Sequence, residues 1–272
     1  MHAAKYFVSL ANGVGIASLR AISGTEEQAL NSNNSLAAIE LIDQLLVDSP
    51  LATVKPGDAG SIPICERDKL LAAIYIDLFG AEIHNTIVCK ACSEQFDLNF
   101  SLLDVQQNLL DAQQNSIEQF NDQLQIDADK RRFFWRDEAG QTVIFRLPTG
   151  EDELVFLNAI ALDPQRIFLQ SCILEASTEP DFEAFEELLE NIAPTIDVEL
   201  DSHCTECHEP HRFDFCLQDY LLEKLKIERG KLNHEVHALA INYHWPLSQI
   251  LSLSREDRLS LYAMTQMEGA LT

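Results

Sequence analysis

The stretches HNTIVCKACSEQFDLNFSLLD (residues 84–104) and TIDVELDSHCTECHEPHRFDFCLQDYL (residues 195–221) follow one pattern. Each has a β-prone run, a turn with two cysteines separated by two residues, a few polar residues, and a second β-prone run. Because side chains alternate across a strand, the apolar residues of each second run share one face. These residues are Phe96, Leu98 and Phe100 in the first stretch, and Phe213, Phe215 and Leu217 in the second. The sequence therefore predicts two strand–turn–strand units of the same kind.

The cysteines of these turns, Cys89, Cys92, Cys204 and Cys207, have the spacing of two zinc knuckles. Zinc binds four soft or borderline ligands in a tetrahedron, and a site closed by four thiolates leaves no position for a substrate. Residues 93–203 separate the two pairs, so one ion would join parts of the chain that are distant in sequence. We therefore expect one structural zinc ion in a split zinc ribbon.

Three other interpretations of these cysteines stay open. A redox Cys-x2-Cys pair usually begins a helix after a buried strand, whereas neither pair here is followed by a helical pattern. The cysteines can instead be ordinary buried side chains, although two pairs with matched flanks are unusual for that role. A nearby histidine (His203, His208 or His211) can replace one cysteine as a ligand. The remaining cysteines, expected in the core, are Cys65, Cys172 and Cys216.

Acidic residues dominate the charge of the chain. It has 44 Asp and Glu against 19 Lys and Arg, a formal net charge of -25. Such a surface repels nucleic acids and anionic membranes, so we expect neither as a partner. It either serves solubility or offers an acidic face to basic partner proteins.

The composition, 46% hydrophobic with 10 glycines and 9 prolines, is typical of a globular protein. No apolar run approaches the roughly 20 residues of a membrane-spanning helix. The N-terminal stretch lacks the apolar core of a signal peptide, so we interpret it as mature sequence of a cytoplasmic protein. Cytoplasmic cysteines rarely form disulfides, which also favours metal.

The hydrophobic periodicity predicts an α+β fold in which helices surround the split zinc ribbon. We expect an N-terminal helical region with the first knuckle, an inserted lobe with a β-hairpin and helices, and a second knuckle followed by a helical C-terminal segment. These parts are residues 1–103, 104–196 and 197–272.

Individual elements follow from the same patterns. Helices are expected at residues 35–47, 66–80, 150–161, 181–192, 217–228 and 231–243, then in SQILSL and from Ser254 onward. The sequence RRFFWRDEAGQTVIFRL (131–147) predicts a hairpin that turns at Glu138–Gly140. Thr149 with Asp152, and Ser254 with Asp257, resemble capping pairs.

The common motifs of enzymes are absent from the sequence. His234-Glu235-Val236-His237 has histidines three apart, whereas the zincin motif needs four. There is no Gly-rich phosphate loop and no nucleophile elbow. We therefore expect no catalytic residues, no organic cofactor and no enzymatic activity.

The segment EVHALAINYHWPLSQILSLSREDRLSLY (residues 235–262) resembles the C-terminal segment of baseplate and tail-assembly proteins of contractile phage tails and related contractile injection systems. In that pattern a helix with Glu-Val-His leads to Tyr-His-Trp, an Ile-Leu-x-Leu turn and an arginine-containing last helix. Three further segments resemble the zinc-ribbon members of this group: residues 66–80, 88–102 and 145–154. The last helix is usually more basic, and here Arg255 and Arg258 are its only cations.

The resemblance implies a structural or assembly role. The protein would bind other baseplate or tail components in the bacterial cytoplasm, as a minor subunit or as a chaperone-like factor. Aromatic and arginine side chains often anchor interfaces, so the expected contact residues are Tyr243, His244, Trp245, Arg255 and Arg258. The alternative is a zinc-ribbon adaptor between proteins unrelated to phage tails.

Overall fold

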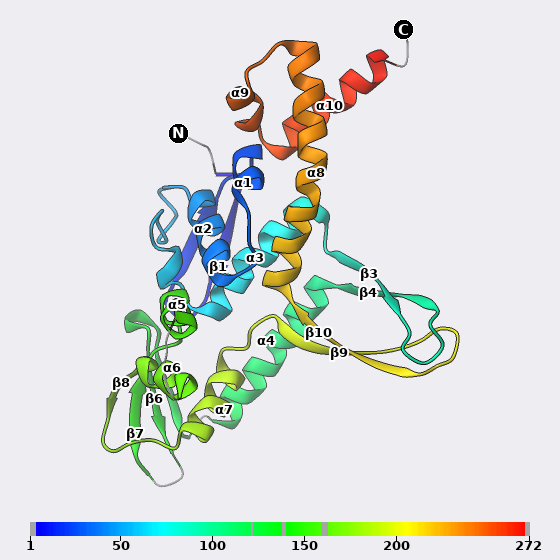
Figure 1. Cartoon of the computed structure of the whole chain (residues 1–272). Coiled ribbons are helices and arrows are strands. Elements are labelled where there is room, and N and C mark those ends of the chain that lie inside the picture. The colour runs from blue at the N-terminus through cyan, green and yellow to red at the C-terminus, as the bar shows by residue number, and fades with distance from the viewer. Residues whose placement is uncertain (1–3, 121, 138–139, 159–162, 270–272) are drawn as a thin grey trace. The chain divides into compact units, whose positions relative to one another are not determined.

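The computed structural model describes residues 4–120, 122–137, 140–158 and 163–269 (Figure 1). The chain forms two compact units. The first comprises Met1–Ser9, Gly15–Ala59 and Asp219–Thr272, and the second Leu10–Val14 and Gly60–Gln218. Segments from both ends of the chain therefore build the first unit, and the middle of the chain builds the second.

The first unit combines a small sheet with helices. Its elements are β1 (Tyr6–Leu10), β2 (Gly15–Leu19), α1 (Gly24–Ala29), α2 (Ser35–Leu45), α8 (Leu217–Tyr243), α9 (Leu247–Leu251) and α10 (Arg255–Gly269). The last residue of β1 and the first two of α8 are counted with the second unit. β1 pairs with β2, and Ile42 and Leu45 on the apolar face of α2 are fully buried. The amphipathic helix that the sequence predicts at residues 35–47 is confirmed as α2.

Side chains that cap helix N-termini explain where several helices of this unit begin. Ser23 accepts a hydrogen bond from the backbone of α1, while Glu26 accepts one from the Ser23 N–H, which is a capping box. Asn34 caps α2. Before α10, the Asp257 N–H donates to Ser254 Oγ over 3.1 Å, so the capping pair predicted there is confirmed.

The C-terminal helices differ from the prediction at one point. The two helices expected at 217–228 and 231–243 form one continuous helix, α8. Gly230 lies in its middle and costs a helix about 1 kcal/mol relative to alanine. Leu225 and Leu232, each 1% exposed, lie on either side of it. Burial of such leucines is worth about 1.5–3 kcal/mol each, which exceeds the cost of the glycine.

The second unit contains two long hairpins, a larger sheet and several helices. Its elements are α3 (Ile64–Phe79), β3 (Glu82–Val88), β4 (Gln95–Ser101), α4 (Leu102–Gln119), β5 (Leu124–Asp127), η2 (Ala128–Lys130), β6 (Arg132–Arg136), β7 (Thr142–Phe145), α5 (Gly150–Asn158), α6 (Pro164–Cys172), β8 (Ile173–Ala176), α7 (Phe182–Ile192), β9 (Asp197–His203) and β10 (Pro210–Cys216); η1 (Ala59–Ser61) spans its boundary. The helix predicted at 66–80 is confirmed as α3, which ends one residue earlier, and the φ of 83° at Gly80 suits a residue without a β-carbon.

The antiparallel sheet β5-β6-β7-β8 contributes to an apolar core of this unit. The ring of Phe145 stacks on that of Phe133, with centroids 5.2 Å apart. It also meets Phe185 of α7 edge-on at 5.1 Å. This core contains two cysteines outside the knuckles, Cys65 and Cys172, whereas Cys216 is half-buried. The core position expected for the first two is confirmed.

The hairpin predicted at 131–147 is confirmed as β6 and β7, which pair from Phe133 with Phe145 to Arg136 with Thr142. Two residues of its predicted turn, Glu138 and Ala139, lie outside the described residues. Strands β5 and β8, which the sequence did not predict, extend the hairpin to a four-stranded sheet.

The predicted helix after the hairpin is confirmed as α5. The Thr149 hydroxyl donates to Asp152 over 2.7 Å, and the Asp152 N–H returns a bond of 3.5 Å. The pKa of Asp152 is lowered to about 2, because hydrogen bonds from Arg146 and Thr149 outweigh the opposing effect of burial. Residues 159–161 of the predicted helix lie outside the described part of the chain.

A buried carboxylate fixes the start of β9 against α3. The Ile196 N–H donates to Asp68 Oδ2 over 2.7 Å, and Asp68 is 6% exposed. Burial raises the pKa of Asp68 to about 6, although the Ile196 N–H and the Arg67 charge act in the opposite direction. The bond joins segments 128 residues apart and so positions the strand that leads to the second knuckle.

We predict that the free energy of unfolding of Asp68→Asn, relative to that of the wild type, increases as the pH rises from 4 to 7. The folded protein holds the Asp68 proton up to about pH 6, whereas the unfolded chain releases it near pH 4. The wild type therefore loses stability over this interval relative to the variant, by up to about 3 kcal/mol. Urea denaturation of both proteins across this range measures the difference.

The matched control is Asp111→Asn on α4, an exposed aspartate. A difference between wild type and Asp68→Asn that does not change with pH would contradict the prediction.

Candidate metal centre

The two predicted strand–turn–strand units are two hairpins with the same register. In the first, β3 pairs with β4 from Glu82 with Ser101 to Val88 with Gln95. In the second, β9 pairs with β10 from Asp197 with Cys216 to His203 with Pro210. Each hairpin therefore has two seven-residue strands and a six-residue loop that begins with its first knuckle cysteine.

The two loops also share their hydrogen bonds. The Cys89 N–H donates to the Glu94 carbonyl over 2.8 Å, and the Ser93 N–H donates to the Cys89 carbonyl over 2.9 Å. The equivalent bonds of the second loop, each 3.0 Å, run from Cys204 to Glu209 and from His208 to Cys204. The repeat in the sequence is thus a repeat of backbone structure.

The residue after each second cysteine has a left-handed backbone. The φ angle of Ser93 is 65° and that of His208 is 60°. This region is unfavourable for residues with a β-carbon, and it turns the chain back toward the second strand. Both loops therefore use the same strained position to aim their two cysteines at one point.

The four knuckle sulfurs meet at that point. The ligand atoms of Cys89, Cys92, Cys204 and Cys207 all lie within 4.8 Å of one another and can hold a metal ion. Cys89 Sγ is 3.6 Å from Cys207 Sγ, and Cys92 Sγ is 3.7 Å from Cys204 Sγ. A tetrahedral ion with bonds of about 2.3 Å separates its sulfurs by about 3.8 Å, whereas a disulfide needs about 2.05 Å. The cysteines are unpaired, and their spacing fits a shared metal.

The electrostatics of the cluster favour a cation. The backbone N–H groups of Cys92 and Ala91 donate to Cys89 Sγ and lower the pKa of this thiol to about 6, while burial opposes them. The Glu94 N–H lowers the pKa of Cys92, but burial and the neighbouring sulfurs raise it to about 12. Cys89 therefore ionises readily while Cys92 stays protonated, because two thiolates so close together repel each other. A divalent cation removes that repulsion.

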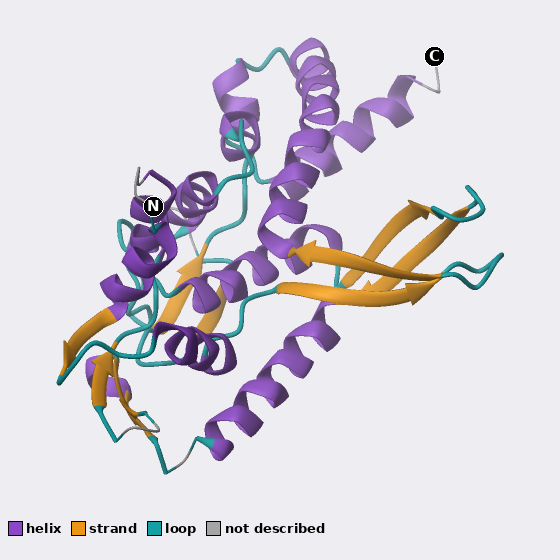
Figure 2. Cartoon of the chain, turned by 60° about the horizontal axis from the view of Figure 1, so that its bottom comes forward, coloured by secondary structure: helices purple, strands orange, loops and turns teal. Residues whose placement is uncertain are grey.

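Little apolar packing surrounds the sulfurs. The buried residues of this cluster are Cys89, Phe96 and Cys204. Further along the hairpins Phe100 of β4 meets Phe215 of β10 edge-on, with centroids 4.9 Å apart. Figure 2 shows the two hairpins side by side, as these contacts require. Few apolar contacts surround the knuckle loops among the described residues, so a bound metal ion would contribute much of the stability of these loops.

His211 is the histidine that the structure brings to the cluster. Its Nε2 lies 3.2 Å from Cys89 Sγ, and its side chain is buried, whereas His203 and His208 are exposed. The ring stacks on Phe213 with centroids 6.0 Å apart. The sequence indicated only that a histidine lay nearby. In the structure His211 is placed to donate a hydrogen bond to a thiolate or to compete with a cysteine as ligand.

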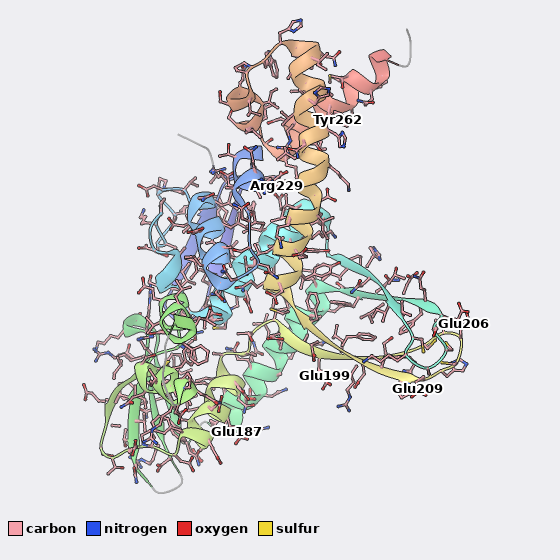
Figure 3. The ribbon with its side chains drawn as sticks, viewed as in Figure 1. Glu187, Glu199, Glu206, Glu209, Arg229 and Tyr262 are labelled. Carbon is pink, nitrogen blue, oxygen red and sulfur yellow. The ribbon has the colours of Figure 1, made fainter. Side chains whose placement is uncertain are left out.

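The surface of the second hairpin is strongly acidic. Figure 3 shows Glu199 along β9, and Glu206 and Glu209 in the loop beyond it. Arg212 of β10 forms ion pairs with Glu199 and Asp201 on the opposite strand. The carboxylates outnumber this cation, as the charge of the whole chain predicts.

Two residues expected to contact a partner form ion pairs within the first unit. Arg258 is 1% exposed; its Nε donates to Glu235 over 2.7 Å and its Nη2 donates to Glu27 over 2.8 Å. Arg255 contacts Glu27 at 3.4 Å and Glu228 at 2.8 Å. The prediction that Arg258 faces a partner is wrong, because two buried carboxylates hold its guanidinium inside the unit. This pairing spans up to 231 residues, and no local sequence pattern indicates it.

The other expected contact residues form the corner after α8. The rings of Tyr243 and Trp245 stack with centroids 5.1 Å apart, and both residues are half-buried. His244 between them is exposed and has a φ of 55°, and its N–H donates to the Ala240 carbonyl. Exposed apolar side chains flank the corner, Ile241 at 58% and Leu247 at 52%.

The sequence profile of a family described as T4 bacteriophage base plate protein matches residues 3–219, more than half of the chain. The chain belongs to this family. The matched range contains both knuckles of this baseplate-family protein and the segments at 66–80, 88–102 and 145–154 that carried the resemblance. The C-terminal segment at 235–262 lies beyond it. No curated protein and no solved structure matches the chain, and no helix among the described residues is long and apolar enough to cross a membrane.

We predict that Arg258→Met destabilises this baseplate-family protein by about 3–5 kcal/mol, because it leaves Glu27 and Glu235 buried without their cation. Urea denaturation followed by far-UV circular dichroism measures the loss. Adding Glu235→Gln to the variant should recover part of it, since one buried charge is then removed.

Arg229→Met is the control. This arginine also lies on α8 but is only half-buried and donates to Asn31, so its loss should cost less than about 1 kcal/mol. Equal losses in Arg258→Met and Arg229→Met would contradict the prediction.

Proposed function

We propose that this baseplate-family protein is a non-enzymatic structural or assembly component of a contractile phage-tail baseplate. It binds other tail components, either as a subunit of the particle or as a chaperone-like factor in the bacterial cytoplasm. The observation that carries the proposal is the family match over residues 3–219, because it covers most of the chain. The same match favours a baseplate role over a zinc-ribbon adaptor unrelated to phage tails.

We propose further that Cys89, Cys92, Cys204 and Cys207 hold one zinc ion, completing a split zinc ribbon. The donor set of four thiolates is the one that structural zinc prefers, and copper(I) and iron–sulfur clusters are the other groups that use it. The sulfur distances support a single ion rather than a cluster, because they match one tetrahedron. When bound, zinc supplies cross-links between the two hairpins and no reaction chemistry.

The hairpins would then act as a rigid arm of the second unit. In Figure 1 they extend away from the four-stranded sheet of the same unit. Their acidic surface residues, among them Glu199 and Glu206, would meet basic faces of tail proteins.

In the first unit, the stacked corner of Tyr243 and Trp245 remains our proposed contact. Half-buried aromatic rings beside exposed apolar residues are typical of interface anchors. His244 is exposed there. Arg255 is the first residue of α10, and 14% of its side chain is exposed. The division into residues 1–103, 104–196 and 197–272 likewise stays a prediction.

We predict one zinc ion per chain in protein purified without added metal, measured by elemental analysis. Cys89→Ser and Cys204→Ser should each lose the ion, because each removes a ligand from a different knuckle. Zinc that survives loss of either knuckle, or absence of zinc, would contradict the shared site and favour the redox interpretation.

Two variants sharpen this measurement. Cys216→Ser changes a half-buried cysteine outside the cluster and should keep the zinc. In a four-cysteine site, Cys207→Ser should lose the zinc and His211→Ala should keep it. If His211 replaces the exposed Cys207 as a ligand, the opposite result is expected.

We predict that tagged protein from its native host co-purifies with sheath, tube or baseplate proteins. Trp245→Ala should reduce this recovery if the corner anchors a partner, while His237→Ala, on the preceding part of α8, serves as control. Recovery of no tail protein by the wild type would count decisively against a baseplate role.

A further inference from the structure

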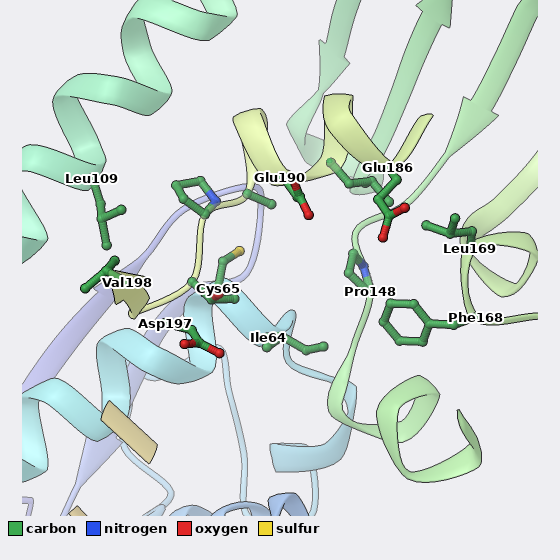
Figure 4. A pocket seen from close by; sticks show the side chains of 14 residues that line it. Ile64, Cys65, Leu109, Pro148, Phe168, Leu169, Glu186, Glu190, Asp197 and Val198 are labelled. Atoms are coloured by element: carbon green, nitrogen blue, oxygen red, sulfur yellow. The ribbon is translucent and has the colours of Figure 1, made fainter. Parts of the chain in front are cut away.

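The second unit contains a cavity of about 580 Å³ away from the cysteine cluster. Residues of α3, α4, α6 and α7, the loop before β9, and β9 itself line it (Figure 4). The volume lies in the range of sites that bury several ligand side chains or a small molecule. Nothing in the family description accounts for this cavity.

Most of the lining is apolar. Phe168 and Leu169 of α6, Leu109 of α4, and Ile64 of α3 contribute to it. The apolar surface continues beyond the cavity, since Leu110 is 37% exposed and lines an adjoining pocket that shares Cys65 and Leu109 with the cavity. Exposed apolar area of this kind favours a protein partner.

The polar lining carries one sign of charge. Glu186 and Glu190 of α7 and Asp197 of β9 line the cavity, and no Lys, Arg or His does so among the described residues. Figure 4 shows the Glu186 and Glu190 side chains directed to the same side of α7, with Asp197 near Cys65.

This arrangement of carboxylates costs the protein stability. Glu186 and Glu190 are one helical turn apart, where like charges repel by about 0.2–0.5 kcal/mol. Gln165 donates to Glu186 over 2.5 Å but brings no charge. A concave surface lined by one sign of charge concentrates its field on counter-charged ligands.

We propose that this cavity binds a basic segment of a partner protein, in which one large apolar side chain is flanked by lysine or arginine. The apolar side chain enters the space between Phe168 and Leu109, and the flanking cations pair with Glu186, Glu190 and Asp197. The inference rests on the proposed function, since it names the chemistry by which a tail component is recognised. A purely apolar segment leaves the three carboxylates unpaired, and an acidic segment or a nucleic acid is repelled by them.

The test uses the purified full-length protein and a fluorescent peptide with one phenylalanine between two pairs of lysines. Two companion peptides replace the phenylalanine by glycine or the lysines by glutamates. We expect the first peptide to bind more tightly than both companions, and its affinity to fall with added salt.

The deciding variant is Glu186→Gln with Glu190→Gln, and the control is Glu183→Gln with Glu187→Gln. Both pairs lie on α7 one turn apart and remove the same charge, but Glu183 and Glu187 are exposed and do not line the cavity. The cavity pair should weaken binding by roughly five- to thirtyfold, because each partly exposed ion pair contributes up to about a factor of five. The control pair should leave binding within about twofold.

Equal weakening by both pairs would overturn the proposal, since it would show only attraction to an acidic surface. Equal affinity for the phenylalanine and glycine peptides would overturn it as well. If tail proteins co-purify equally with the wild type and the cavity variant, the baseplate role stands and this binding site does not. If the peptide binds as expected but no tail protein is recovered, the site stands and the baseplate role does not.

Discussion

Four sulfur atoms from two distant parts of the chain meet within 4.8 Å, and the arrangement of the second unit depends on that meeting. Without a cation, the sulfurs oppose one another, because ionising Cys89 makes the next thiol harder to ionise. With a cation, the same four groups become a cross-link between β3–β4 and β9–β10. The packing around them, chiefly Phe96 with Phe213 and Phe100 with Phe215, is too small to hold two hairpins alone. Everything between the knuckles therefore folds inside a loop that the cluster closes.

The closed loop has a core of its own, which explains how so long an insertion is tolerated. Phe133, Phe145 and Phe185 pack where the four-stranded sheet meets α7, and none of them touches the sulfurs. Asp68 then links the end of this insertion to α3 through the Ile196 N–H. This link lowers stability as the pH rises from about 4 to about 6, since the Asp68 carboxylate, once ionised, must stay buried to hold the start of β9.

The sequence predicted best what depends on neighbours along the chain. Matched flanks identified both hairpins, and capping pairs identified the starts of α5 and α10, because these signals lie within a few residues. Three features escaped it because their partners are far away in sequence. Strands β5 and β8 are short and form only against the β6–β7 hairpin. Helix α8 continues through Gly230 because leucines on both sides of it are buried. Arg258 points inward because it forms ion pairs with the buried Glu27 and Glu235. His211 was predicted in part: the sequence places it near the second knuckle, but only the structure shows its contact with Cys89.

The fate of the two arginines changes how the acidity of the chain should be understood. With Arg258 buried and Arg255 paired, α10 offers a partner little positive charge, so recognition has to rely on the carboxylates and on apolar surface. The carboxylates of the second unit are placed in two different ways. Those of β9 lie on an exposed hairpin, where Arg212 pairs with Glu199, and in the proposed role they would supply long-range attraction with little selectivity. Those of α7 border an apolar cavity, where a cation can be selected together with its neighbouring side chain. A basic tail protein drawn in by the first set would be distinguished from other cations by the second.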